Sequence, residues 1–102
     1  MIVRLVRMTF RADGVDRFLQ IFEDLRHRII AMPGCQHLEL LQDLDDPRVL
    51  TTYSHWRSPE DLERYRGSDL FASEWPAVKA LFEFPAEAWS NSSLHRMLPQ
   101  AS

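Results

Sequence analysis

The sequence predicts one α+β domain whose elements follow the order strand, helix, hairpin, helical region and strand. Three observations lead to this fold class. Apolar residues recur at helical spacing over residues 15–30, directly after a strand-like stretch at 2–10. Two further strand-like runs, 35–43 and 49–56, flank a short turn. The length of 102 residues, with 45% apolar side chains, is enough for one hydrophobic core but not for two.

The first strand and the first helix are marked by their composition and by the residues at their ends. Residues 2–10 are rich in Val, Leu, Ile and Phe, which favour strands. Asp13 is predicted to cap the helix that follows, and the segment 32–34, Met-Pro-Gly, is predicted to end it. The apolar stripe of this helix consists of Val15, Phe18, Leu19, Phe22, Leu25, Ile29 and Ile30.

The second half of the chain is predicted to hold a helical region in two segments and a last strand. Ser58 followed by Pro59 is typical of a helix start, and Gly67-Ser68 is predicted to break the helix. A second segment carries apolar residues from Leu70 to Phe82, although Pro76 should disturb its hydrogen bonds. The last strand is placed at 88–94, so we expect a domain over 1–95 and a loose tail over 96–102.

This order of elements predicts a four-stranded antiparallel sheet of the ferredoxin-like βαββαβ type, with both helical regions on one face. The opposite face is then uncovered. If Leu50, Thr52, Ser54 and Trp56 face the helices, the uncovered face receives a mixed apolar and aromatic set: Val49, Thr51, Tyr53, His55, Val3, Leu5 and Arg7. A face of this kind favours burial against a second copy, so the sequence predicts a homodimer.

Charge and composition argue against several classes of partner. The net charge of −3 offers no broad basic surface, so no nucleic acid partner is expected. The apolar runs are far shorter than the roughly 20 residues that cross a bilayer. The N-terminus runs directly into strand-like sequence, so no signal peptide is expected, and the single cysteine, Cys35, cannot form an internal disulfide. A cytoplasmic protein without a membrane partner is therefore predicted.

Seven short segments have a recognisable order and spacing: MIVRLVR at 1–7, PGC at 33–35, YSHW at 53–56, SPEDL at 58–62, YR at 65–66, SDLF at 68–71, and Trp75. In this order they resemble the antibiotic biosynthesis monooxygenase (ABM) domains of the dimeric α/β-barrel superfamily, over about residues 1–90. The resemblance implies a ferredoxin-like protomer, a dimer closed by the two sheets, and a ligand cavity between each sheet and its helices.

The resemblance also implies a choice of chemistry. Some members of the family oxidise polycyclic phenols to quinones with molecular oxygen and without flavin, haem or metal, because an electron-rich phenolate itself reduces oxygen. Relatives that degrade haem use an Asn in the first strand, a Trp that ends the third strand and a His in the second helical region. Here Trp56 matches, but Val6 and Trp75 stand at the other two positions. Haem degradation is therefore not expected, and no cofactor is predicted.

The leading prediction is thus a cofactor-independent monooxygenase-like oxidoreductase that acts on, or at least binds, a small aromatic, phenolic or quinone-type molecule. The alternative is a non-catalytic dimeric protein of the same fold that binds a small molecule or is related to stress. Oxygen consumption with hydroquinones or anthrones separates the two.

Aromatic side chains near the end of the third strand are the predicted site. Trp56 and Tyr65 are the candidate catalytic residues, and the Tyr65 hydroxyl is a potential hydrogen-bond donor or acid/base. The candidate substrate-binding residues are Arg4, Thr52, Ser54, Phe71 and Trp75. Thr52 and Ser54 are small and favour a space, and Arg4 suits a phenolate or carboxylate. The alternatives are that the aromatics are simply core and that the Arg4 head reaches solvent.

Two histidines form a second candidate cluster. If paired hairpin residues have numbers that sum to 92, His37 lies opposite His55 and Glu39 lies opposite Tyr53, all on the uncovered face. These ligand types suit zinc or iron, but no tightly spaced ligand motif supports a metal site. A polar network at the subunit interface is therefore favoured, and no metal is predicted.

Overall fold

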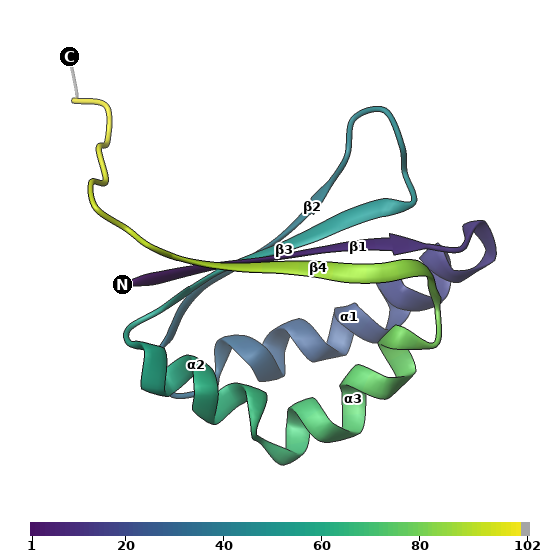
Figure 1. The fold of residues 1–102 in the computed structure, drawn as a ribbon, viewed down its shortest axis with the longest axis horizontal. Coiled ribbons are helices and arrows are strands. Elements are labelled where there is room, and N and C mark those ends of the chain that lie inside the picture. Colours follow the sequence, from purple (N-terminus) through teal and green to yellow (C-terminus); the bar gives the residue numbers. More distant parts are fainter. Residues whose placement is uncertain (101–102) are drawn as a thin grey trace.

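The computed structural model describes residues 1–100 and shows an antiparallel sheet with all of its helices on one face (Figure 1). The predicted ferredoxin-like arrangement is confirmed, because the strands lie in the order β2-β3-β1-β4. The elements are β1 (Ile2–Phe10), a short 3-10 helix η1 (Ala12–Gly14), α1 (Val15–Ile30), β2 (Cys35–Gln42), β3 (Val49–Trp56), α2 (Pro59–Arg66), α3 (Asp69–Lys79) and β4 (Phe82–Ser92). No helix within residues 1–100 is long and apolar enough to cross a membrane.

The central strand β3 shows the predicted alternation of its two faces. Leu50, Ser54 and Trp56 lie on the side that faces the helices, and their exposed fractions are 2%, 6% and 1%. The core forms two clusters of buried side chains there: Met8, Phe10, Phe18, Phe22, Leu50 and Val78 in one, and Leu25, Ile29, Trp56 and Leu62 in the other. Each large apolar side chain so buried contributes about 1.5–3 kcal/mol, so this face holds most of the stabilising contacts.

The opposite face of the sheet carries no helix, and segments rise from it at both ends. The β2–β3 turn and the C-terminal segment both project from this side in Figure 1. His37 pairs with His55 and Glu39 with Tyr53, as predicted for the hairpin. Trp89, which pairs with Leu5 on this face, leaves 45% of its surface exposed. We call this side, away from the helices, the open face.

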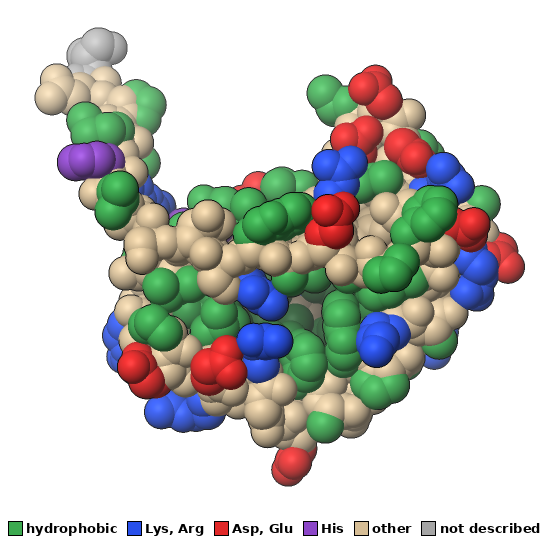
Figure 2. Space-filling model, in the orientation of Figure 1, with side chains coloured by type: hydrophobic (Ala, Val, Ile, Leu, Met, Phe, Trp, Pro, Cys, Tyr) green, Lys and Arg blue, Asp and Glu red, His purple; other side chains and the backbone are tan. Residues whose placement is uncertain are grey.

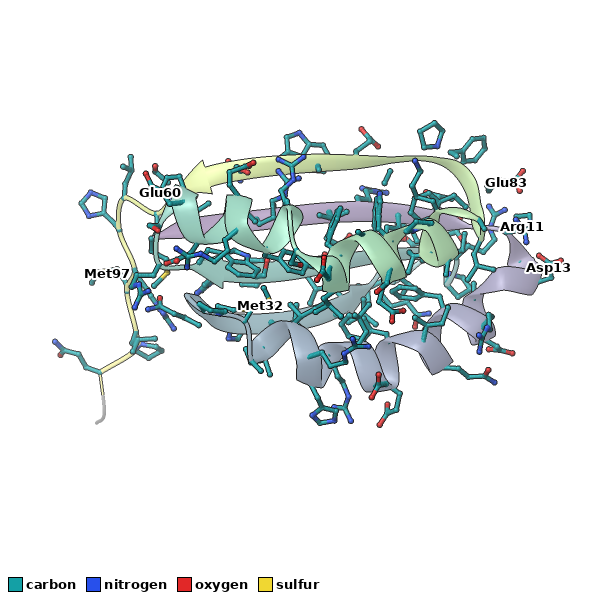
Figure 3. The ribbon with its side chains drawn as sticks, turned by 90° about the horizontal axis from the view of Figure 1, so that it is seen from below. Arg11, Asp13, Met32, Glu60, Glu83 and Met97 are labelled. Carbon is teal, nitrogen blue, oxygen red and sulfur yellow. The ribbon has the colours of Figure 1, made fainter. Side chains whose placement is uncertain are left out.

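The start of α1 differs from the prediction. Asp13 does not cap α1; it lies inside η1, and the capping position is Gly14, with no side-chain hydrogen bond. The Asp13 carboxylate instead accepts a hydrogen bond from Arg11 Nε at 3.2 Å, and both residues protrude at the same corner of the molecule in Figure 3. A nearby guanidinium competes for the carboxylate, so the local capping preference does not decide the helix start.

The last strand is longer and begins earlier than predicted. It spans Phe82–Ser92 instead of 88–94, and Phe82 therefore belongs to the sheet and not to the preceding helix. Pairing with β1 from Phe10 to Ile2 overrides the weak strand preference of its serines. Pro85 is tolerated because β4 is an edge strand, where one missing amide breaks no inner ladder.

The helical region follows the predicted division at Gly67-Ser68. Ser58 caps α2 by accepting a hydrogen bond from the Asp61 amide, and Ser68 caps α3 by accepting one from the Phe71 amide, both at 3.2 Å. Pro76 lies inside α3 without ending it. Beyond β4, the chain crosses from the β4 side of the sheet toward the α1 side, where Met97 is seen in Figure 3.

The turn between α1 and β2 depends on Gly34. Its φ of 83° lies in the left-handed region, which side chains disfavour by about 1–2 kcal/mol. A Cβ atom at this position would also overlap the Asp61 side chain. That carboxylate is held in place by Arg57 at 3.2 Å and Arg64 at 2.8 Å, so it cannot retreat without breaking ion pairs.

We expect Gly34→Ala to lower the free energy of unfolding by about 2 kcal/mol or more, from backbone strain and the collision with Asp61. Gly67→Ala is the matched control, because Gly67 has a φ of −94° and a new Cβ there meets only ordinary contacts. Urea denaturation of both variants measures the difference. Equal stability of the two variants would contradict this account of the turn.

Candidate functional site

The four predicted aromatic residues form a continuous chain of rings across β3, α2 and α3. Trp56 stacks on Tyr65 with ring centroids 5.0 Å apart, and Phe71 meets the Tyr65 ring edge-on at 5.3 Å. Phe71 in turn stacks on Trp75 at 5.5 Å. The convergence predicted from the sequence is thus present. The chain ends at Phe82 of β4, whose ring lies 5.7 Å from that of Trp75.

The polar atoms of Trp56 and Ser54 form a hydrogen bond with each other within the core. The Trp56 indole Nε1 donates a hydrogen bond to Ser54 Oγ at 3.0 Å, and both residues are buried. The Trp56 ring also packs with Leu25 and Ile29 of α1. Neither polar group therefore points to open space. Thr52, two residues earlier on the same side of β3, is half-buried.

Tyr65 keeps its proton at neutral pH. Burial raises the pKa of Tyr65 to about 12, and the nearby Cys35 thiol adds to the rise. A β-bulge between Cys35 and His37 brings Cys35 into register with Trp56, on the helix side of the sheet. A neutral phenol of this kind donates a hydrogen bond and does not accept a proton.

Arg4 provides positive charge between the sheet and α2. Its Nη1 donates a hydrogen bond to Ser90 Oγ at 2.8 Å, across the β1–β4 pair. Burial lowers the pKa of Arg4 and Arg66 lowers it further, whereas Glu63 acts in the opposite direction. Arg66 Nη1 is itself paired with Glu63 Oε1 at 3.0 Å, so Arg4, bonded to a neutral hydroxyl, is the group at this place that suits an anionic ligand.

The surface is hollowed between β4 and the α2–α3 layer, and hydrophobic side chains gather around this recess in Figure 2. Ala88 and Ser90 of β4 occupy helix-facing positions opposite Val6 and Arg4, yet both are exposed. Because these side chains are small and the helices do not extend over this edge of the sheet, the space beside β4 is not filled. The chain of rings comes from the same helices, and its members Tyr65, Phe71 and Trp75 are half-buried.

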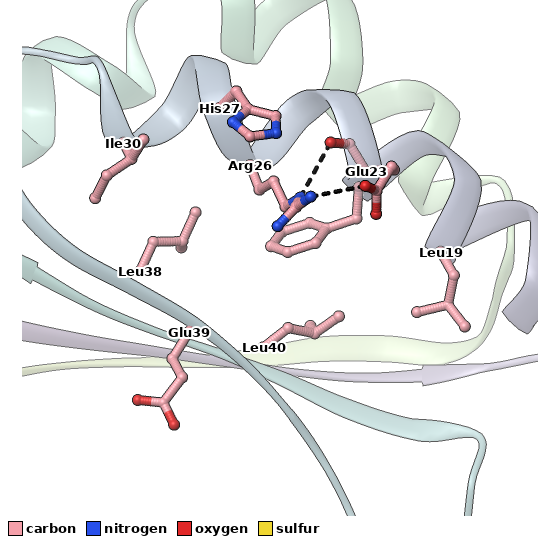
Figure 4. A pocket seen from close by; sticks show the side chains of 9 residues that line it. Leu19, Glu23, Arg26, His27, Ile30, Leu38, Glu39 and Leu40 are labelled. Carbon is pink, nitrogen blue, oxygen red and sulfur yellow. Dashed lines mark hydrogen bonds and ion pairs between the residues drawn. The ribbon is translucent and has the colours of Figure 1, made fainter.

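A second cavity, of about 660 Å³, lies at the other edge of the sheet between α1 and β2 (Figure 4). Leu19 and Ile30 border it with exposed fractions of 41% and 42%, although the periodicity of α1 placed both on the buried stripe. The other lining residues are Phe22, Glu23, Arg26, His27, Leu38, Glu39 and Leu40. Arg26 and Glu23 pair with each other at 2.7 Å, so the charges at this rim are already satisfied.

Sequence reasoning missed the partners of Arg4. The bond to Ser90 follows from the β1–β4 register, which the misplaced start of the last strand concealed. Whether Arg66 lies near Arg4 depends on the angle at which α2 crosses the sheet. The spacing of residues in the sequence does not predict that angle. A signal for the α1–β2 cavity did exist, because a stripe containing both Leu19 and Ile30 is wider than one packed face requires.

Comparison with known proteins gives a family and a fold. The family model described as "Antibiotic biosynthesis monooxygenase" matches residues 1–73. A search of curated proteins finds no match. Solved structures resemble the chain closely in shape but weakly in sequence.

Three of these structures illustrate the likeness. A conserved protein from Methanosarcina mazei Go1 has 21% identity and a TM-score of 0.84, over 89% of this chain and 91% of its own. Rv0793 from Mycobacterium tuberculosis has 20% identity and a TM-score of 0.86, over 93% and 96%. A mutant of SnoaB, a cofactor-independent oxygenase from Streptomyces nogalater, has 18% identity and a TM-score of 0.84, over 97% of each chain.

We expect Trp56→Ala to lower the free energy of unfolding by about 3–5 kcal/mol, the range for a large aromatic truncated in a packed core. Trp75→Ala, at a half-buried ring of the same chain, should be less destabilising. Denaturation midpoints of the two variants, compared with the wild type, measure these losses of stability. A small loss for Trp56→Ala, together with loss of aromatic-ligand binding, would instead place Trp56 beside a ligand space.

Proposed function

Because the chain belongs to the antibiotic biosynthesis monooxygenase family, we propose that it oxidises a small phenolic or quinone-type aromatic molecule with molecular oxygen and without a cofactor. The observation that carries the proposal is the chain of rings beside a recess, with the Arg4 guanidinium bonded to Ser90 on the same side of the sheet. Aromatic walls with one or two polar groups are typical of sites for planar ligands. The description of SnoaB as a cofactor-independent oxygenase supports the reaction class.

In the proposed reaction, the protein stabilises the ionised substrate. The substrate phenol or its keto form loses a proton, and the Arg4 guanidinium lowers the free energy of the resulting anion. The anion transfers electrons to oxygen and a carbon–oxygen bond forms. One oxygen atom stays on the ring as a carbonyl, and the other leaves as water with two hydrogens from the substrate. Tyr65 donates a hydrogen bond to the anion, and the rings exclude water.

A non-catalytic binding protein is the second candidate, and one observation favours it. Tyr65 has a pKa of about 12 and cannot serve as a base at neutral pH, and the Trp56 and Ser54 polar groups are bonded to each other. The substrate itself must then be acidic enough to ionise beside Arg4. A ligand that is not acidic enough to ionise would be bound in the same recess without being oxidised.

Oxygen uptake with anthrone and hydroquinone substrates tests the proposed activity. We expect Tyr65→Phe to lower kcat/KM by about tenfold to hundredfold, since a hydrogen bond to an ionised group contributes about 1.5–3 kcal/mol. The wild-type rate should not fall through Tyr65 ionisation below about pH 10, because the phenol keeps its proton there. Phe84→Ala, which removes a ring that is 58% exposed, is the control and should be neutral. Saturable binding without oxygen uptake would favour the binding protein.

We further propose that the protein is a homodimer in which the open faces of two copies pack together. Trp89 and Leu5 are adjacent apolar residues on this face, and Tyr53 lies beside Leu5 in the β1–β3 register. Apolar and aromatic side chains on a sheet face gain about 25 cal/mol per Å² when a second copy removes them from water.

Tyr53→Asp should convert the dimer to a monomer at micromolar concentration, because it places an unpaired charge in a desolvated interface. Gln20→Asp adds the same charge on the exposed side of α1 and should leave assembly unchanged. Sedimentation velocity measures the oligomeric state of both variants. A wild-type protein that sediments as a monomer would rule out packing through the open face.

A further inference from the structure

The C-terminal segment beyond β4, residues 93–100, leaves the sheet with its apolar side chains exposed. Its start is fixed by a hydrogen bond from the Ser93 amide to the Met1 carbonyl at 3.1 Å. Leu94, Met97 and Leu98 are all exposed, and the segment belongs to no helix or strand. In Figure 1 it rises from the side of the sheet that carries no helix. Exposed apolar residues gathered in one segment are typical of a contact that another surface completes.

The two edges of the sheet differ in how they are protected against pairing with another chain. β4 carries Pro85, and its pairing with β1 is irregular at two places. Proline and bulges both discourage the addition of a strand. β2 forms the other edge, pairs regularly with β3 from His37 to Gln42, and contains no Pro or Lys. Its outer backbone groups are therefore available to an added strand.

An apolar groove lies beside this free edge. In the cavity of about 660 Å³, Leu38 and Leu40 of β2 face Leu19 and Ile30 of α1 (Figure 4). A strand added to β2 would direct every second side chain to the helix side of the sheet, where this groove lies. A free strand edge beside side-chain pockets is the arrangement that binds an extended peptide, through backbone hydrogen bonds and alternate side chains.

The C-terminal segment has the side-chain pattern that this groove accepts. Leu94 and Leu98 are four residues apart, so both point to the same side of an extended chain. Residues 93–100 include Arg96 and no acidic residue. The groove is lined by two carboxylates, Glu23 and Glu39, and by one guanidinium, so acidic groups outnumber basic ones when histidine is neutral. The apolar pattern and the sign of the charge therefore both match.

The length and direction of the segment favour the groove of a second copy over its own. The segment leaves the sheet at the β4 edge, whereas its own groove lies at the β2 edge, about 14 Å away across three strand spacings. Packed sheets lie only about 10 Å apart, in the direction in which the segment rises. Residues 94–100 span about 23 Å when extended, so the segment can cross to a facing copy and still pair along several residues.

We propose that the C-terminal segment of one copy adds as a strand to the β2 edge of a second copy, and that Leu94 and Leu98 occupy the groove between α1 and β2. In a two-fold symmetric dimer the exchange occurs twice, once in each direction. This proposal rests on the proposed homodimer through the open faces. It adds a second contact, which lies at the edges of the two sheets and on the helix side.

Disulfide trapping between two different variants tests the exchange. Leu98→Cys in a tagged chain is mixed with Leu19→Cys or Ile30→Cys in an untagged chain, all with Cys35→Ala, and is oxidised after subunit exchange. Leu19 and Ile30 both line the groove, and Leu98→Cys should form a covalent heterodimer with at least one of them. Asp24→Cys is the control, because Asp24 contacts Arg28 on the side of α1 that faces Glu74 of α3. It should not be trapped.

The dissociation constant of the dimer separates this proposal from the open-face dimer. Leu94→Ser with Leu98→Ser should raise that constant by about tenfold or more in sedimentation experiments, because both side chains lose their apolar contacts. Leu94→Met with Leu98→Met keeps apolar side chains and should assemble as the wild type does.

Three results would overturn the exchange and leave the open-face dimer in place. The first is a wild-type dimer whose dissociation constant is the same in the double serine variant. The second is trapping of Leu98→Cys by Asp24→Cys as efficiently as by the groove variants. The third is a disulfide that forms within one chain carrying Leu19→Cys and Leu98→Cys, and not between chains, because the segment would then occupy its own groove. A monomeric wild-type protein would overturn both proposals.

Discussion

The packing of Trp56 is the contact on which the position of the helix layer depends. This side chain ends the central strand, is 1% exposed, stacks on Tyr65 of α2, and belongs to one buried cluster with Leu25 and Ile29 of α1 and Leu62 of α2. One ring therefore joins the sheet to two helices. Because its indole nitrogen is satisfied by Ser54, it can be buried without loss of a hydrogen bond. The start of the chain of rings is fixed by this contact, whereas Phe71 and Trp75 follow from the angle of α3.

Side chains along β3 alternate between the two faces of the sheet, so neighbouring residues lie in two different environments. Thr52, Ser54 and Trp56 point to the helices, and Tyr53 and His55 point to the open face. The first set borders the apolar core, and the second lies on the open face beside His37 and Glu39 of β2. A slip of one residue in the pairing would exchange the two sets and bury His55 in the core. Register therefore decides which side chains line the core and which lie on the open face.

The sequence was most informative where local pattern and tertiary packing agree. The hairpin register and the cap at Ser58 followed from spacing and residue type, and the structure confirms both. Prediction failed where a particular side-chain or strand partner, and not the local preference, decides the outcome. Asp13 is held by Arg11 in place of capping α1, and β4 starts at Phe82 because β1 supplies a pairing edge.

The candidate site divides in the same way. That the aromatics converge could be predicted, since their order along the chain brings the helices back over the strand end. Whether a ring faces space or packed neighbours could not, because this depends on helix angles within about an ångström. Trp56 and Trp75 have the same residue type but differ in burial for this reason. The proximity of Arg4 to Arg66 likewise has no local signal.

The attachment of the C-terminal segment has a consequence for dynamics. Its backbone is fastened to the sheet at Ser93, whose amide bonds to Met1, while Leu94, Met97 and Leu98 are 83%, 87% and 72% exposed. A segment with so little buried apolar surface can detach in a local opening with a free energy far below that of global unfolding. Variants that stabilise the core would leave the frequency of this local opening unchanged.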